Sequence, residues 1–148
     1  MKAHTLTTTF ESLGVPASLV KVLAAEGKTE AFEIQAATLA DTLAGGDVLG
    51  RGKTGSGKTL AFSIPVVARL AQAKAEGRIR RTSGAPTGLI LAPTRELATQ
   101  IAAAISPLAQ TENLVVTTVF GGVKQGRQVE AFRRGVDIVV ACPGRLED

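Results

Sequence analysis

The spacing of apolar positions predicts two short helices near the amino terminus. In residues 16–26 three apolar side chains share one helical face, and Gly27 follows as a stop signal. Residues 34–44 form a second helical stretch, which a pair of glycines closes. We therefore expect two helices before the first strand of the fold.

Longer apolar runs alternate with helical segments through the rest of the chain. Predicted strands occupy residues 47–50, 88–92, 114–120 and 137–141, and predicted helices occupy residues 58–75, 95–109 and 124–134. This alternation predicts an α/β fold, in which an open parallel sheet carries helices on both faces. The run at residues 88–92 is entirely apolar, so we expect that strand to be covered on both faces.

Composition narrows the class of protein. With 148 residues, 45% of them hydrophobic, the chain has the length and apolar content of one globular domain. Its formal net charge of +4 favours anionic partners, either nucleic acid or acidic lipid headgroups. A single cysteine, Cys142, excludes an intrachain disulfide. No apolar run approaches the roughly 18 residues that a membrane span needs, and the first nine residues lack a signal-peptide core. We expect a cytoplasmic chain with no membrane partner.

The most specific motif is a glycine-rich loop at residues 52–59, which reads GKTGSGKT. It matches the phosphate-binding pattern G-x-x-x-x-G-K-[ST] and lies between a predicted strand and a predicted helix, as that pattern requires. Glycines let backbone N–H groups approach phosphate oxygens, and the start of the helix adds a partial positive charge. Lys58 and Thr59 are the predicted catalytic residues: Lys58 can reach the β- and γ-phosphates, and the Thr59 hydroxyl can bind Mg²⁺. The predicted nucleoside triphosphate site consists of Thr54, Gly55, Ser56, Gly57, Lys58 and Thr59.

A segment upstream of this loop resembles the adenine-recognising Q motif of DEAD-box RNA helicases. Phe10 precedes residues 27–35, GKTEAFEIQ, which end in Gln35. The resemblance implies that Phe10 packs on the adenine base and that the Gln35 amide reads its edge. An amide offers a donor and an acceptor, which match adenine N7 and the N6 amine; taken alone, Gln35 is an ordinary helix residue. Three positions depart from the family pattern, which usually has an apolar residue and two prolines there: Lys28, Ala31 and Glu33.

Residues 92–100, APTRELATQ, resemble motif Ia of the same family and follow a predicted strand. In open α/β sheets, ligands bind at the carboxyl ends of the strands. The resemblance implies that Pro93, Thr94 and Arg95, with the first amides of the next helix, bind RNA phosphates. The same segment also suits a helix cap, with Thr94 as the cap and Glu96 in the first turn. The two roles are compatible.

Two further segments resemble RNA-contacting elements that the family places after the next two strands. A pair of glycines follows residues 114–120, and residues 142–148, CPGRLED, match motif Ib. The resemblance implies contacts with the phosphate backbone from both segments, while a simple turn is the alternative for the glycine pair. The implied RNA-binding residues are Gly121, Gly122, Pro143, Gly144 and Arg145. Cys142 stands where the family usually has threonine, and we expect it to be a small buried apolar side chain.

Five motifs in the family's order therefore cover residues 10–148. They imply part of a RecA-like P-loop NTPase domain, with ATP and Mg²⁺ as cofactors. They also imply RNA as a partner, gripped by its backbone independently of base sequence, and no particular accessory protein. We expect one incomplete helicase ATP-binding domain over residues 1–148, because the family's D-E-A-D motif and second domain come later in its order.

The sequence holds no D-E-A-D motif, which supplies the Mg²⁺-holding and water-activating carboxylates of the family. We therefore expect this chain alone to hydrolyse ATP negligibly and to unwind nothing. The strand at residues 47–50 would lack its usual neighbours, which predicts exposed sheet edges with marginal stability or self-association. Lys53 replaces the family's usual glutamine, and it either tightens nucleotide binding or faces solvent. The alternatives are a non-catalytic nucleotide- or RNA-binding module from a truncated gene and another P-loop enzyme, such as a DNA-acting helicase relative.

Overall fold

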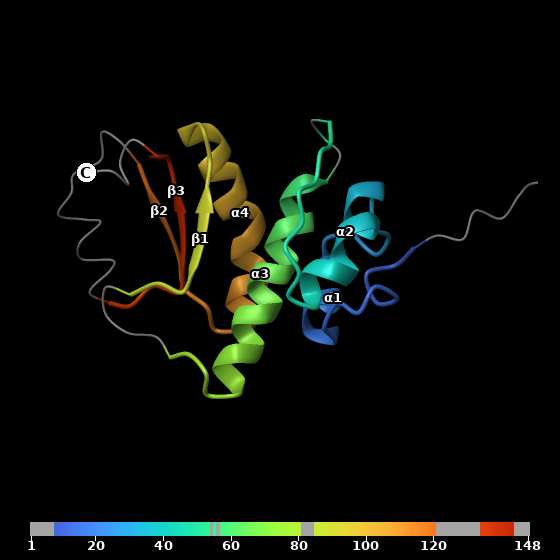
Figure 1. Ribbon diagram of the computed structural model, residues 1–148, viewed down its shortest axis with the longest axis horizontal. Helices are drawn as coiled ribbons and strands as arrows, with labels where there is room; N and C mark the ends of the chain where they lie inside the picture. The colour runs from blue at the N-terminus through green and yellow to red at the C-terminus, as the bar shows by residue number, and fades with distance from the viewer. Residues whose placement is uncertain (1–7, 54, 56, 81–84, 121–133, 144–148) are drawn as a thin grey trace, which may run out of the picture. The chain divides into compact units, whose positions relative to one another are not determined.

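The chain divides into two compact units, Met1–Ala68 and Arg69–Asp148. The computed structural model (Figure 1) describes residues 8–53, 55, 57–80, 85–120 and 134–143. The boundary between the units falls within α3, Lys58–Ala75, a helix whose bounds are those that the sequence predicts. The prediction of one domain over residues 1–148 stays a prediction.

Two short helices in the first unit confirm the predicted pattern within one residue at each end. Helix α1, Ala17–Ala25, buries Leu19 and Leu23. It stops at Gly27, whose φ of +77° lets the Gly27 and Lys28 N–H groups bond back to carbonyls of the last turn. Helix α2, Glu33–Leu43, buries a polar side chain, Gln35, along with Leu39.

The strand predicted at residues 47–50 does not form. These residues are exposed and have neither helical nor strand structure, and the Leu49 side chain is fully exposed. An apolar run becomes a strand only when a neighbouring strand accepts its backbone hydrogen bonds. No strand pairs with residues 47–50 within the described part of the chain, so the run stays irregular.

Three parallel strands form the sheet of the second unit, in the order β1-β3-β2. Strand β1 is Gly88–Leu91, β2 is Val116–Val119 and β3 is Ile138–Ala141. Strand β3 is central, and all four of its residues are buried. Strand β1 is not covered on both faces as expected: Ile90 is buried, whereas Leu89 and Leu91 are 56% and 55% exposed. The difference follows from position, because among the described strands β1 has a neighbour on one side only.

Helix α4, Arg95–Thr111, packs against β2 and β3 through buried residues at helical spacing, among them Ala98, Ile101 and Ile105. Figure 1 shows α4 running alongside the three strands. The prediction of an α/β fold with a parallel sheet packed on helices is confirmed. The helix predicted at residues 124–134 lies outside the described residues, apart from Arg134, which belongs to a turn.

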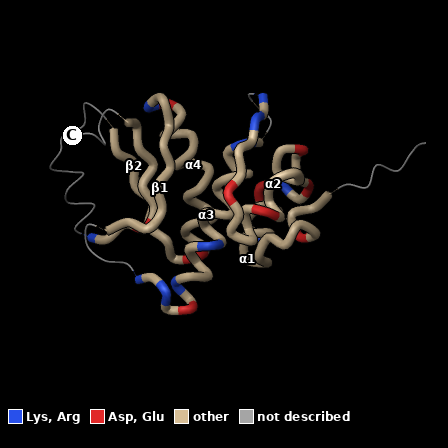
Figure 2. The backbone as a smooth tube through the Cα atoms, viewed as in Figure 1, with Lys and Arg blue, Asp and Glu red and all other residues tan. Residues whose placement is uncertain are grey.

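Basic residues lie on both connections of α3, as Figure 2 shows. After its last turn, the Arg78 guanidinium donates to the Glu76 carboxylate at 2.7 Å, and Gln72 donates to the same carboxylate. These hydrogen bonds hold the pKa of Glu76 below its usual value. Both side chains of this ion pair are exposed.

Candidate functional site

The glycine-rich loop leads directly into α3, so Lys58 is the first residue of the helix. Gly55 and Gly57 have φ values of +81° and +85°, and a Cβ added at Gly55 would meet no atom within 4 Å. The backbone at Gly55 therefore faces open space, which phosphate oxygens can enter. Lys58 is exposed, and it has no carboxylate partner among the residues that the structure describes. Lys53 is also exposed.

The Gln35 side chain connects the predicted Q motif to the glycine-rich loop. Its Oε1 accepts a hydrogen bond from the Phe32 N–H at 2.9 Å, and its Nε2 donates to the Gly57 carbonyl at 2.9 Å. The side chain is 2% exposed. One N–H and one oxygen lone pair remain for a ligand, but they are available to a base only when this buried amide is uncovered.

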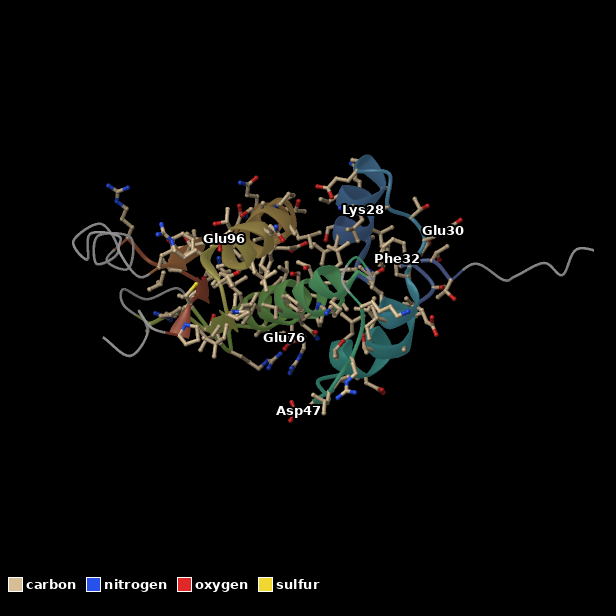
Figure 3. The ribbon with its side chains drawn as sticks, turned by 90° about the horizontal axis from the view of Figure 1, so that it is seen from above. Lys28, Glu30, Phe32, Asp47, Glu76 and Glu96 are labelled. Carbon is tan, nitrogen blue, oxygen red and sulfur yellow. The ribbon has the colours of Figure 1, made fainter. Side chains whose placement is uncertain are left out.

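Three groups meet at Gly57. A Cβ at this position would lie 2.5 Å from Gln35 Nε2 and 2.5 Å from Phe32 Cδ2. A Cβ atom does not approach other non-bonded heavy atoms this closely, so the absence of a Cβ at Gly57 allows an aromatic ring and an amide to contact the phosphate-binding backbone. Phe32, which precedes α2 (Figure 3), is 58% exposed. Sequence reasoning missed Phe32, because one aromatic before a helix carries no signal until its neighbours are known.

Phe10 lies in the core of the first unit, with 1% of its side chain exposed. Its N–H donates to the Thr29 carbonyl at 3.2 Å, and its carbonyl accepts from the Val15 N–H. These bonds fix the chain before α1. The contact between Phe10 and an adenine base stays a prediction, and this structure leaves the ring almost no exposed surface for it.

The predicted RNA-binding segments of the second unit follow strands that end at one edge of the sheet. Leu91, Val119 and Ala141 are in register at the carboxyl ends of β1, β2 and β3. Because the strands are parallel, the residues after each strand gather along that edge. Pro93 and Pro143 are both exposed there.

Thr94 and Arg95 occupy the start of α4 at this edge. The Thr94 hydroxyl oxygen accepts a hydrogen bond from the Leu97 N–H at 3.1 Å, which confirms its predicted role as the helix cap. Glu96 lies in the first turn, also as predicted (Figure 3). The capping bond uses the hydroxyl as an acceptor, so its O–H can still donate to a phosphate oxygen.

The Arg95 guanidinium lies over the ring of Phe120, with 5.4 Å between Cζ and the ring centroid. Phe120 follows β2, so this contact joins the ends of two strands. A cation–π contact holds a guanidinium in place while leaving its charge intact. Sequence reasoning missed Phe120, and its position directly before a glycine pair was the available signal.

Some predicted site residues lie outside the described residues: Thr54, Ser56, Gly121, Gly122, Gly144 and Arg145.

Cys142 is 9% exposed, as expected for a small apolar side chain. Within the described ranges, no cluster of three His, Cys, Asp or Glu residues could hold a metal ion. None of the described helices is long and apolar enough to span a membrane.

Comparisons with known proteins agree with the motif order. A family model described as DEAD/DEAH box helicase matches residues 32–148. The chain is 46% identical over 136 residues to a maize (Zea mays) protein named DEAD-box ATP-dependent RNA helicase 3B, chloroplastic, covering 92% of this chain. It is 39% identical over 139 residues to Nucleolar RNA helicase 2 of Rattus norvegicus, covering 94% of this chain.

A solved structure shows the same fold. The RNA helicase Prp28 from Chaetomium thermophilum, bound to ADP, matches with a TM-score of 0.81 at 35% identity, over 93% of this chain and 33% of that one. This likeness confirms the RecA-like fold class. The chain spans only 18% and 17% of the length of the maize and rat relatives.

The relatives correct one prediction. The expectation of a cytoplasmic location is contradicted, because the maize protein is named chloroplastic and the rat protein nucleolar. The match to the family model extends over more than half of the chain, from Phe32 to Asp148, and the motifs occur in the family's order. The chain belongs to the DEAD/DEAH box helicase family.

Proposed function

We propose that this chain is the ATP-binding and RNA-backbone-binding portion of an ATP-dependent RNA helicase that unwinds short duplexes. The observation that carries the proposal is the contact at Gly57, where the Gln35 amide meets the backbone next to Lys58. A group suited to adenine thereby adjoins a loop suited to phosphates. Relatives named ATP-dependent RNA helicases, and the Prp28 structure with ADP, support the same ligand class.

The nucleotide is held by groups of the first unit. The backbone at Gly55 and Gly57 and the amino end of α3 bind phosphate oxygens, because their N–H groups and the helix dipole favour negative charge. The Lys58 ammonium, which has no carboxylate partner among the described residues, reaches the β- and γ-phosphates. The Thr59 hydroxyl, in the first turn of α3, is a ligand for Mg²⁺, which neutralises charge between those phosphates.

RNA is bound along the carboxyl edge of the sheet in the second unit. Thr94 and Arg95 at the start of α4, and the exposed Pro93 and Pro143 segments, contact the sugar–phosphate backbone. Contacts with phosphates carry no base information, so binding is independent of RNA sequence. The three segments that the resemblance assigns to RNA all follow predicted strands, which is consistent with one continuous contact surface.

The 148-residue chain by itself hydrolyses ATP negligibly under this proposal. The D-E-A-D carboxylates are absent from its sequence. In related NTPases an arginine finger is worth about 10³ to 10⁵ in rate, and the family carries that group in its second domain. Multiple-turnover hydrolysis stimulated by RNA, measured with this purified chain, would show that the catalytic groups have been misassigned.

Replacing Lys58 tests the nucleotide site. We expect Lys58→Ala to abolish measurable Mg–ATP binding in calorimetric titrations, because the variant loses the ammonium that neutralises the β- and γ-phosphates. Lys21→Ala in α1 removes the same charge from another exposed position and is the matched control. If both variants bind Mg–ATP as tightly as the unaltered chain, the phosphate site is elsewhere and the proposal fails.

Replacing Arg95 tests the RNA surface separately. Each protein charge that neutralises a phosphate of a single strand contributes about 0.7 to the slope of log affinity against log salt concentration. We expect Arg95→Ala to reduce that slope by about this amount, equally for two unrelated RNA sequences. An unchanged slope would remove Arg95 from the interface, and an effect on one sequence only would contradict recognition of the backbone.

A further inference from the structure

Phe32 is the one large aromatic side chain that the described part of the first unit exposes. It is 58% exposed, whereas Phe10 is 1% exposed. Single exposed apolar side chains are common on protein surfaces, so exposure alone does not indicate a site. The groups that surround the Phe32 ring indicate whether it belongs to a binding site.

The ring lies against the phosphate-binding backbone. Its Cδ2 atom is 2.5 Å from the point that a Cβ of Gly57 would occupy, and Gln35 Nε2 is equally close to that point. Gly57 directly precedes Lys58, the first residue of α3. The exposed ring of Phe32 and the buried amide of Gln35 therefore both lie against the backbone of Gly57, at the end of the phosphate loop.

We propose that Phe32 supplies the aromatic surface on which the base of the bound nucleotide stacks. This inference rests on the proposed ATP site and adds a residue to it. The base is connected to the triphosphate through the ribose, so it must lie near the loop that holds the phosphates. Among the described groups bordering Gly57, Phe32 offers an exposed flat apolar face, and the Gln35 amide is covered. Every nucleobase has a π-face, so an aromatic ring there contributes affinity without choosing the base.

The inference divides two tasks between neighbouring residues. Stacking on Phe32 strengthens binding of any nucleoside triphosphate, because it depends on the π-face of the base. Hydrogen bonding to Gln35 distinguishes adenine from guanine, because it depends on donors and acceptors at the edge of the base. Phe32 replacements should therefore change affinity, and Gln35 replacements should change the preference for ATP over GTP.

The test compares dissociation constants of Mg–ATP, Mg–GTP and inorganic tripolyphosphate, which has no base. We expect Phe32→Leu to weaken ATP and GTP by a similar factor, about 5- to 150-fold, the range that about 1–3 kcal/mol of stacking corresponds to. Tripolyphosphate should bind this variant as it binds the unaltered chain. Phe32→Tyr keeps the ring and should restore affinity for both nucleotides. Leu89→Ala, at a position of similar exposure in β1, is the matched control.

Several outcomes overturn the inference, and they differ from those that overturn the ATP site itself. If the chain binds ATP but Phe32→Leu binds it unchanged, Phe32 does not stack on the base, while the proposed function stands. If Phe32→Leu weakens tripolyphosphate as much as ATP, the side chain acts through the shape of the loop. If the unaltered chain binds neither ATP nor tripolyphosphate, or Lys58→Ala binds ATP equally well, the proposed function fails and the inference fails with it.

Discussion

Replacing Gly57 by alanine tests the geometry on which the nucleotide site depends. Gly57 has a φ of +85°, and holding an alanine in that left-handed region costs about 1–2 kcal/mol. The added Cβ would also displace the Gln35 amide, which lies 2.5 Å from it. Losing the hydrogen bond from Gln35 to the Gly57 carbonyl costs about 0.5–1.5 kcal/mol more. We expect Gly57→Ala to lower the free energy of unfolding by about 1.5–3.5 kcal/mol.

Gly55→Ala is the matched control, because Gly55 has a φ of +81° but open space where its Cβ would lie. It should lose only the backbone contribution, about 1–2 kcal/mol. Urea denaturation of both variants gives the comparison. In a Gln35→Ala background, Gly57→Ala should cost less than in the unaltered chain, since the amide that it displaces is gone. If Gly57→Ala is no more destabilising than Gly55→Ala, the contact between Gln35 and the loop is absent.

Three further changes probe separate parts of the account. Gln35→Ala should reduce the ratio of ATP to GTP affinity, measured by calorimetry, because the amide that matches adenine is lost; an unchanged ratio would contradict its assignment. Thr94→Ala should lower the free energy of unfolding by about 0.5–2 kcal/mol through loss of the 3.1 Å capping bond to Leu97, whereas Thr94→Ser should keep most of it. Phe120→Leu should weaken single-stranded RNA binding about 2- to 5-fold, as expected for a cation–π contact of about 0.5–1 kcal/mol. For this variant the slope of log affinity against log salt concentration should match that of the unaltered chain, because the Arg95 charge remains. A lower slope would contradict the idea that Phe120 only holds Arg95 in place.

Local patterns were enough to predict most elements of the fold. The bounds of α3 follow from the loop before it and the alanine-rich sequence of the helix. The end of α1 follows from Gly27, because glycine readily adopts the left-handed φ, here +77°, that such a stop requires. The prediction of a strand at residues 47–50 was wrong because a strand needs a neighbouring strand to pair with, and the apolar run does not specify that neighbour. For the same reason β1 could not be recognised as an edge among the described strands: its sequence looks as buried as that of β3.

In the candidate site, residues that belong to a motif could be predicted from the sequence, whereas contacts that depend on tertiary packing could not. The spacing of the phosphate loop is enough to predict roles for Lys58 and Thr59, because phosphate binding tolerates few other residue types at these positions. The sequence did not indicate that Phe10 is buried and Phe32 exposed, since both are single aromatics beside polar residues. Nor could it show that Arg95 lies over Phe120, because the two residues come from different strand ends.

The most direct test of the central claim is to follow backbone amide shifts of the isotope-labelled chain in two NMR titrations. Mg–ATP should shift the amides of Phe32, Gln35, Gly55, Gly57, Lys58 and Thr59. A single-stranded RNA of arbitrary sequence should shift those of Thr94, Arg95, Phe120 and Cys142. The account would be contradicted if saturating Mg–ATP left the amide shifts of Gly55, Gly57, Lys58 and Thr59 unchanged. It would also be contradicted if RNA left unchanged the amide shifts at the carboxyl edge of the sheet.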